Sequence, residues 1–401
     1  MTRRYVRSLG PLGLAIVMLG LACAPAPASG PDSGSAGAPA PAQSSAAQEA
    51  GAASAPASAP APSAAAAAPS SAAQGASKSL TEVLPPLNPP VDFKVRVGNS
   101  LTTAPWYYAL DKGYFRDLGI NFVEVTIQNS GDVAAPLATG ELDAAGTAFG
   151  PGIYNAVRRD IPIVAVADNG QLNRGLASSA AVVKKGEAAN YQAWCDLRGK
   201  RVAIPAKSTG FYVTLAKALR DECNLSAEVV DWVEIPFGNA NQAVANGSVE
   251  AALQVEPFVS RGLQDGTIDV FKTMDEAYVD QQMNMIIFSP QMMQRRDVGL
   301  RALVAYLKGA RDYNAAIRQG VGRDEYKQIM ARHLAITDPE AYETMIPMGI
   351  DLNGRINVPS VRESLVIYRD AGMIPGGGEI ELQWIDQSLV EEAQRILDAT
   401  K

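Results

Sequence analysis

Histidine and cysteine are scarce in this 401-residue sequence, which contains one histidine, His333, and three cysteines. With so few of them and no Cys/His cluster, a zinc site or a Ser-His-Asp triad has little to work with. Charged residues make up 19% of the chain, and the formal net charge is −7. Because no basic stripe accompanies this acidic balance, we expect no nucleic-acid partner. We also expect no metal ion, no cofactor and no catalytic residue.

The N-terminus lacks an apolar run long enough to span a bilayer comfortably, since its apolar stretch runs only from Leu9 to Leu21. Three arginines precede this stretch and Cys23 follows it. The arrangement resembles a bacterial lipoprotein signal peptide over residues 1–22, after which Cys23 would be lipidated. It departs from that pattern at Gly20, where leucine is usual. An ordinary signal peptide, with Cys23 incidental, is the alternative.

Large apolar residues and charges are nearly absent from the segment that follows, residues 23–79, which is built from Ala, Pro, Ser and Gly. Such a segment cannot bury enough apolar surface to offset its ordering entropy, and its prolines prevent a continuous helix. We therefore predict a disordered tether, which would attach the folded part to the membrane through the lipid on Cys23.

The remaining chain alternates strand-like and helix-like segments in two blocks, which begin at Val91 and at Lys200. This order predicts an α/β fold of two lobes with parallel-rich sheets. The predicted first lobe comprises residues 80–180, the second lobe residues 181–285, and residues 286–401 complete the first lobe with a helical tail. The apolar runs 180–183 and 285–288 are interpreted as the crossings between the lobes.

The stretch DLRGKRVAIPAKSTGFY, residues 196–212, has the outline of a phosphate-binding loop. The strict motif needs glycine at the positions that Arg201 and Ala206 occupy, because backbone N–H groups must wrap around the phosphates there. The nucleotide-binding interpretation therefore fails. The same outline fits the mouth of a ligand-binding protein.

Open α/β sheets bind ligands outside the carboxyl ends of their strands, so we take the loops after the predicted strands as candidate ligand-binding segments. Aromatic side chains with a few polar groups, the usual lining of a small-molecule cleft, occur in these loops. The candidate ligand-binding residues are Trp106, Phe149, Asn169, Arg174, Lys207, Ser208, Thr209, Tyr212, Gln254 and Glu256.

Cys195 and Cys223 are predicted to form a disulfide in an exported chain. Cys195 precedes the strand 201–205, and Cys223 ends the helix expected from about residue 209 to 222. A strand followed by a helix that runs back brings both cysteines to the same edge of the layer. Two unrelated, small buried residues are the alternative.

Four stretches of the chain resemble periplasmic substrate-binding proteins of the NitT/TauT type, which serve ABC importers for nitrate, sulfonates and taurine. These stretches are residues 104–120, 130–152, 196–219 and 239–261. The resemblance implies a type II periplasmic-binding fold with two hinged lobes, a monomeric receptor outside the cytoplasm and an ABC permease as partner. It also implies that Ser208 and Thr209 face the cleft.

Two interpretations stay open for most of these residues. In the first interpretation, the first N–H groups of the helix after Thr209 bind an anion, and Lys207 and Arg174 add positive charge. In the second, Ser208 and Thr209 only cap the helix. Glu256 resembles an acidic residue at the cleft edge of this family, where its carboxylate would bind an amine of the ligand. Alternatively, it accepts hydrogen bonds from nearby backbone. Trp106 either stacks on the ligand or packs in the core.

We expect a lipid-anchored receptor for a small polar, anionic organic solute such as a sulfonate, taurine or a carboxylate. A binding protein for pyrimidine precursors is the first alternative. An enzyme like the thiamine-pyrimidine synthases or desulfinases of this fold is disfavoured, because neither Cys195 nor Cys223 lies in a strand-end loop. A sensor for a signalling partner is the third possibility.

Overall fold

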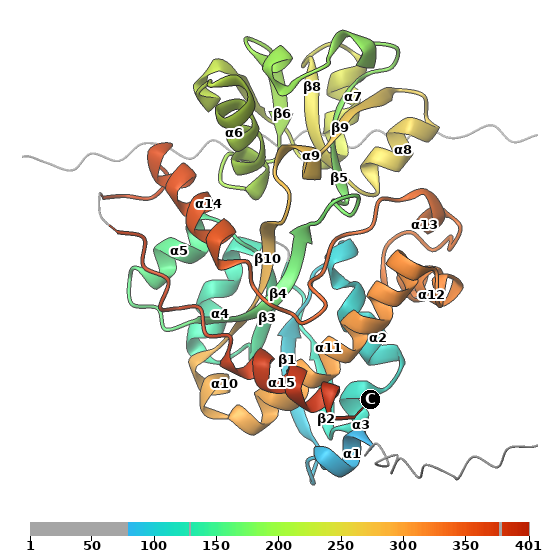
Figure 1. The fold of residues 1–401 in the computed structure, drawn as a ribbon, viewed down its shortest axis with the longest axis vertical. Coiled ribbons are helices and arrows are strands. Elements are labelled where there is room, and N and C mark those ends of the chain that lie inside the picture. Colours follow the sequence, from blue (N-terminus) through green and yellow to red (C-terminus); the bar gives the residue numbers. More distant parts are fainter. Residues whose placement is uncertain (1–78, 128–129, 377–378, 401) are drawn as a thin grey trace, which may run out of the picture. The chain divides into compact units, whose positions relative to one another are not determined.

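The structure is a computed structural model that describes residues 79–127, 130–376 and 379–400 (Figure 1). The predicted signal peptide, Cys23 and all of the predicted tether except Ser79 lie outside the described residues.

The first sheet has five strands in the order β2-β1-β3-β10-β4. The strands are β1 (Val91–Arg96), β2 (Ile120–Glu124), β3 (Ala144–Ala148), β4 (Val164–Leu172) and β10 (Gln281–Phe288). β1 pairs in parallel with β2 and β3, whereas β10 is antiparallel to both β3 and β4. Along β1, Phe93 and Val95 are buried, whereas Asp92 and Lys94 are exposed, as the alternating sequence requires.

The second sheet also has five strands, in the order β7-β6-β8-β5-β9. They are β5 (Ser179–Lys184), β6 (Arg201–Ile204), β7 (Asp231–Glu234), β8 (Ala251–Val255) and β9 (Ile268–Thr273). β6 is parallel to β7 and β8, and β5 runs antiparallel to β8 and β9. The predicted α/β class with two sheets is confirmed, and both sheets are mixed.

The two apolar runs that were interpreted as crossings are strands instead. Residues 180–183 belong to β5, which lies between β8 and β9, and residues 285–288 belong to β10, between β3 and β4. Both runs lie in interior strands and are wholly buried, which is why they are apolar. The chain passes between the sheets at residues 173–178 and 274–280, before the predicted boundary at residue 285.

Helices fill the connections and form the C-terminal region (Figure 1). Those of the first sheet are α1 (Leu80–Val83), α2 (Ala104–Asp111), α3 (Tyr114–Asp117), α4 (Ala134–Thr139) and α5 (Pro151–Val157). Those of the second sheet are α6 (Gly210–Cys223), α7 (Phe237–Ala245), α8 (Phe258–Gln264) and α9 (Met274–Ala277). The C-terminal helices are α10 (Pro290–Gln294), α11 (Arg296–Gln319), α12 (Arg323–His333), α13 (Ala341–Thr344), α14 (Val358–Asp370) and α15 (Ser388–Asp398).

Short 3₁₀ turns complete the secondary structure. They are η1 (Leu101–Thr103), η2 (Ser130–Val133), η3 (Ala188–Asn190), η4 (Trp194–Leu197) and η5 (Ala227–Val229). Among the residues that the structure describes, no helix combines the length and the apolar character needed to cross a membrane.

The long helix α11 is the backbone of the C-terminal region and packs closely on α2. Gly309 permits this approach, because a Cβ atom there would lie 2.2 Å from the Pro105 carbonyl oxygen. Tyr306, one turn earlier, donates its hydroxyl to the Asp168 carbonyl at 2.9 Å. The tail therefore belongs to the core of the first sheet, to which β4 also contributes.

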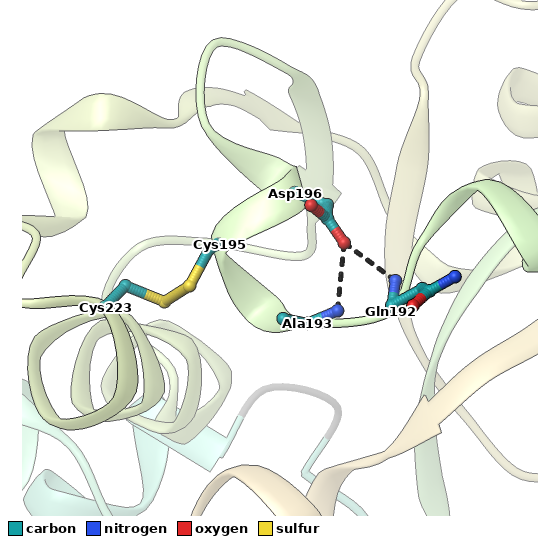
Figure 2. Close-up of a disulfide and its surroundings, with 5 residues drawn as sticks. All are labelled: Gln192, Ala193, Cys195, Asp196 and Cys223. Carbon is teal, nitrogen blue, oxygen red and sulfur yellow. Dashed lines mark hydrogen bonds between the residues drawn. A yellow bond between two sulfur atoms is a disulfide. The ribbon is translucent and has the colours of Figure 1, made fainter.

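The disulfide expected between Cys195 and Cys223 is present (Figure 2). It joins η4 to the last residue of α6, with the two Cα atoms 5.6 Å apart. Asp196 fixes the turn beside it, because its carboxylate accepts hydrogen bonds from the N–H groups of Gln192 at 2.7 Å and Ala193 at 2.9 Å. The C-terminal end of α6 is thus tied to η4, the turn that precedes β6 in the second sheet.

Candidate functional site

A cavity of about 270 Å³ lies among the strand ends of both sheets. From the first sheet it receives η1, the end of β3 at Ala148 and the middle of β10 at Met283 and Asn284. From the second sheet it receives the end of β8 and the first turn of α6. Strand ends of two α/β sheets that face one cavity are the arrangement expected for a ligand site.

The lining is mainly apolar, with hydroxyl and amide groups at intervals. The apolar side chains include Leu101, Phe211, Phe237, Met283 and Met348. The polar ones are Ser100, Thr102, Ser178, Ser179, Thr209 and Asn284, besides the carboxyl group of Glu256. This is the usual composition of a site for a small organic molecule.

A second cavity, of about 310 Å³, adjoins the first. The two share five lining residues, namely Ser100, Leu101, Phe237, Val255 and Glu256. The rest of the second cavity comes largely from the segment that follows α12, with Leu334, Ala335 and Ile336, and from Tyr342 and Met345 around α13. The C-terminal region therefore forms one wall of this cavity.

The first turn of α6 presents backbone N–H groups to the first cavity. Thr209 precedes the helix in an extended conformation, and its Oγ1 donates to the Ala206 carbonyl at 2.7 Å. Its side chain therefore does not cap the helix, and the N–H groups of Gly210 and Phe211 have no acceptor within the helix by position. Gly210 lies close to β10, since a Cβ atom there would be 2.8 Å from Met283 Sδ.

The NMT1/THI5-like family pattern matches residues 101–317, more than half of the chain, and these residues supply most of the lining of the first cavity. The protein belongs to the NMT1/THI5-like family. This match and the two-sheet fold confirm the resemblance to periplasmic substrate-binding proteins that the four sequence stretches indicated.

Solved structures share the fold of this NMT1/THI5-like chain at low sequence identity. The periplasmic aliphatic sulphonate-binding protein SsuA of Escherichia coli has a TM-score of 0.56 and 16% identity, over 72% of this chain and 94% of that one. The periplasmic nitrate-binding protein NrtA of Synechocystis has a TM-score of 0.57 and 12% identity, over 78% and 91%. The alkanesulfonate-binding protein SsuA of Xanthomonas axonopodis, bound to MOPS, has a TM-score of 0.54 and 14% identity, over 76% and 98%. No curated protein matches the sequence.

Two of the ten candidate ligand-binding residues, Thr209 and Glu256, line the first cavity of this family member. Lys207 and Ser208 immediately precede Thr209 but are not among the described lining residues. The Lys207 backbone N–H donates to the Glu234 carboxylate at 2.9 Å. Arg174 lies in a separate surface depression with Arg318 and Asp351. The two cations that would have bound an anion therefore lie outside the cavity lining.

Trp106 and Asn169 are buried and contact each other in the core of the first sheet. Trp106 is fully buried beside Phe115 and Tyr306, and its Nε1 donates to Asn169 Oδ1 at 2.8 Å. The core-packing alternative for Trp106 therefore holds, and Asn169 satisfies the indole N–H.

The other candidates have structural partners of their own. Phe149 stacks on Trp384 with ring centroids 6.1 Å apart, and Tyr212 packs on Trp232 at 5.1 Å. Gln254 is buried, and its Nε2 donates to the Phe237 carbonyl at 3.0 Å. None of these three is among the described residues that line the first cavity.

Glu256 combines a structural role with a position on the cavity wall. Its Oε1 accepts from the Ile346 N–H at 3.1 Å and from the Ser260 hydroxyl at 3.0 Å, and its Oε2 accepts from the Ser260 N–H at 3.1 Å. Burial raises the pKa of this carboxyl group above its usual value, and the three hydrogen bonds oppose that rise. Glu256 thus connects the second sheet to the segment after α13.

Sequence reasoning missed the residues that β10 and the C-terminal region bring to the first cavity, above all Met283, Asn284 and Met348. β10 reads as QQMNMIIF, and an interior strand of that kind carries no signal that its middle faces a ligand. Met348 is more than a hundred residues from α6 along the chain. Only its placement by the fold could identify it.

The electrostatics of both cavities are simple. Among the described lining residues there is no lysine, arginine or histidine, and Glu256 is the one carboxylate. The described part of the chain also contains no group of His, Cys, Asp and Glu side chains arranged to hold a metal ion. The first N–H groups of α6, at the positive end of the helix dipole, also lie at the first cavity.

Proposed function

We propose that the protein is an extracytoplasmic solute-binding protein that holds a small organic molecule in the first cavity and delivers it to an ABC importer. The observation that carries the proposal is that cavity, because its wall is shared by η1 and β10 of the first sheet and by α6 and β8 of the second. Family membership and the fold of the sulfonate- and nitrate-binding proteins support the same function. Lipidation of Cys23 and the segment 23–79 would hold the receptor at the membrane.

A ligand in this cavity would contact both sheets at once, and it would favour the conformation in which they lie together. Side chains of the segments that belong to the two sheets already contact one another next to the cavity. Gln281 in β10 donates from Nε2 to the Gly210 carbonyl at 3.0 Å, and its Oε1 accepts from the Thr214 hydroxyl at 2.6 Å. The ligand would add its contacts to this set and so stabilise the conformation in which the two sheets lie together. A permease would recognise that conformation.

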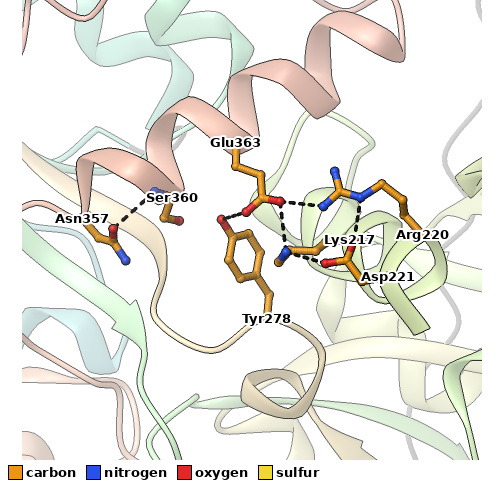
Figure 3. A network of polar contacts seen from close by, with 7 residues as sticks. All are labelled: Lys217, Arg220, Asp221, Tyr278, Asn357, Ser360 and Glu363. Carbon is orange, nitrogen blue, oxygen red and sulfur yellow. Dashed lines mark hydrogen bonds and ion pairs between the residues drawn. The ribbon is translucent and has the colours of Figure 1, made fainter.

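A second set of contacts joins α6 to α14 (Figure 3). The Glu363 carboxylate accepts from Lys217 Nζ at 3.0 Å, from Arg220 at 2.6 Å and from the Tyr278 hydroxyl at 2.7 Å. α14 also packs against β10, so this network connects the second sheet to the first. These side chains are partly exposed, and each ion pair therefore contributes little, about 1 kcal/mol or less. A conformational change between the halves would break them at small cost.

A receptor for pyrimidine precursors is the second candidate, and Glu256 is the observation that favours it. A carboxylate has about four acceptor positions, of which three are occupied here. The remaining position would suit an N–H donor on the ligand. The same carboxylate disfavours a simple anion, because the described lining residues provide no side-chain cation to compensate it.

A thermal-shift screen tests the proposal. The full chain carrying Cys23→Ser, which prevents lipidation, would be melted with alkanesulfonates, taurine, nitrate, aromatic carboxylates and aminopyrimidines. We expect saturable stabilisation by at least one class, because a ligand that binds only the folded state raises its stability. Ala148→Phe would fill the first cavity and abolish the shift.

The matched control is Ala189→Phe, since Ala189 is an exposed alanine in η3 that lines neither cavity. It should leave the shift unchanged. Ligand stabilisation that survives Ala148→Phe would place binding outside the cavity and contradict the proposal.

A further inference from the structure

The two cavities have different chemistry although they share a wall. Hydroxyl and amide side chains concentrate in the first cavity, where the N–H groups of α6 also begin. In the second cavity the Tyr342 hydroxyl is already engaged, because it donates to the Ile336 carbonyl at 2.9 Å. The remaining walls there are formed mainly by apolar side chains such as Phe258, Leu334 and Met345.

The charge of the walls limits the charge of the occupant. An ionised group that leaves water needs a partner charge or several hydrogen bonds to offset its desolvation. The described lining residues of both cavities include no cationic side chain, and the Glu256 carboxyl group lies in the wall that they share. An anion placed between the cavities would meet that carboxylate without a countercharge.

From this geometry we propose that the ligand is an uncharged, elongated molecule. Its polar end, an amide or hydroxyl, bonds in the first cavity near Thr209, and its hydrocarbon or aromatic end occupies the second cavity between Phe258 and Met345. The inference rests on the proposed function and deepens it by naming the ligand class. Leu101 and Phe237, which line both cavities, would lie beside the middle of such a molecule.

Two matched ligand series test the inference by calorimetric titration of the full chain carrying Cys23→Ser. One series runs from propanamide to heptanamide, and the other from propanesulfonate to heptanesulfonate. We expect the amides to bind more tightly than sulfonates of equal length. Each added methylene should tighten amide binding about fourfold while the apolar end enters the second cavity.

Ala335→Phe tests the second cavity independently of the first, because Ala335 lines only the second. Its side chain is exposed, so the substitution is compatible with folding. The variant should bind propanamide like the parent and lose the gain with chain length. Ala148→Phe should abolish binding of both series.

Tighter binding of the sulfonates, or a chain-length gain that Ala335→Phe leaves intact, would overturn the inference and leave the proposed function standing. Absence of binding for both series, together with no Ala148-dependent ligand in the wider screen, would overturn the proposed function and the inference with it.

Discussion

Removal of the disulfide is the perturbation whose magnitude the structure defines best. The bond links η4 to the last residue of α6, and the two cysteines are 28 positions apart. In the chain-entropy description, a cross-link stabilises the folded state because it restricts the unfolded chain. For a loop of this length the lost entropy is about 12 cal/mol/K, which corresponds to about 3.6 kcal/mol at 25 °C.

The assay compares urea unfolding of two forms of the full chain, the Cys23→Ser chain and the same chain with Cys195→Ser and Cys223→Ser added. We expect the double substitution to lower the free energy of unfolding by about 3.6 kcal/mol. Reduction of the parent by dithiothreitol should reproduce the loss, whereas the double variant should not respond to it.

Ligand binding should be almost unchanged, since the disulfide lies at the opposite end of α6 from Thr209 and Gly210. A loss smaller than about 1 kcal/mol would refute the entropic reasoning. It would mean that the segment between the cysteines keeps structure in the unfolded state. A large loss of ligand affinity would show instead that the far end of α6 controls the first turn.

Three further predictions concern packing, pH and salt. Gly309→Ala should lower the free energy of unfolding by about 3 kcal/mol, because the added Cβ would overlap the Pro105 carbonyl. The control Gly152→Ala, with no atom within 4 Å of its Cβ, should change that free energy by less than about 1 kcal/mol. Urea unfolding of the two variants measures the difference. Burial raises the pKa of Asp168 from 3.8 to about 7, so the folded state binds its proton more tightly than the unfolded state. The contribution of Asp168 to stability should then fall by roughly 4 kcal/mol as the pH rises from about 4 to about 7, and Asp168→Asn should remove that contribution. Urea midpoints of the parent and of Asp168→Asn whose difference does not change over this range would contradict the assigned direction. Glu363→Gln removes the ion pairs to α6, and we expect the free energy of unfolding to fall by less than about 1 kcal/mol. This difference should disappear in about 1 M salt. A difference that does not depend on salt would mean that the ion pairs are not responsible.

The alternation of strands and helices allowed the fold class, the two sheets and the disulfide to be predicted from sequence. It did not locate the crossings between the sheets, since β5 and β10 read as apolar runs whether they join two lobes or lie inside one sheet. The side chains of β9 are mostly half-buried and show no alternation, so the sequence carries no clear strand signal there. Periodicity reports burial, and burial alone does not say which strands are neighbours.

The structure places two of the candidate site residues beside one cavity. The stretch 196–212 does bring Thr209 to a cavity at the first turn of α6, and Glu256 lies on the wall of the same cavity. The direction of a side chain depends on packing, however, so loop position alone could not separate these residues from Trp106 and Tyr212, which are core residues.

By itself the sequence determined the local structure of this protein, because hydrophobic periodicity, helix starts and cysteine spacing act over short distances along the chain. It also made a zinc site or a nucleic-acid interface improbable. Only the tertiary structure decided the lining of the cavities, since Met283, Met348 and Tyr342 come to them from distant segments. It also decided their charge, because Arg174 and Lys207 are close to the site in sequence and outside its lining in space.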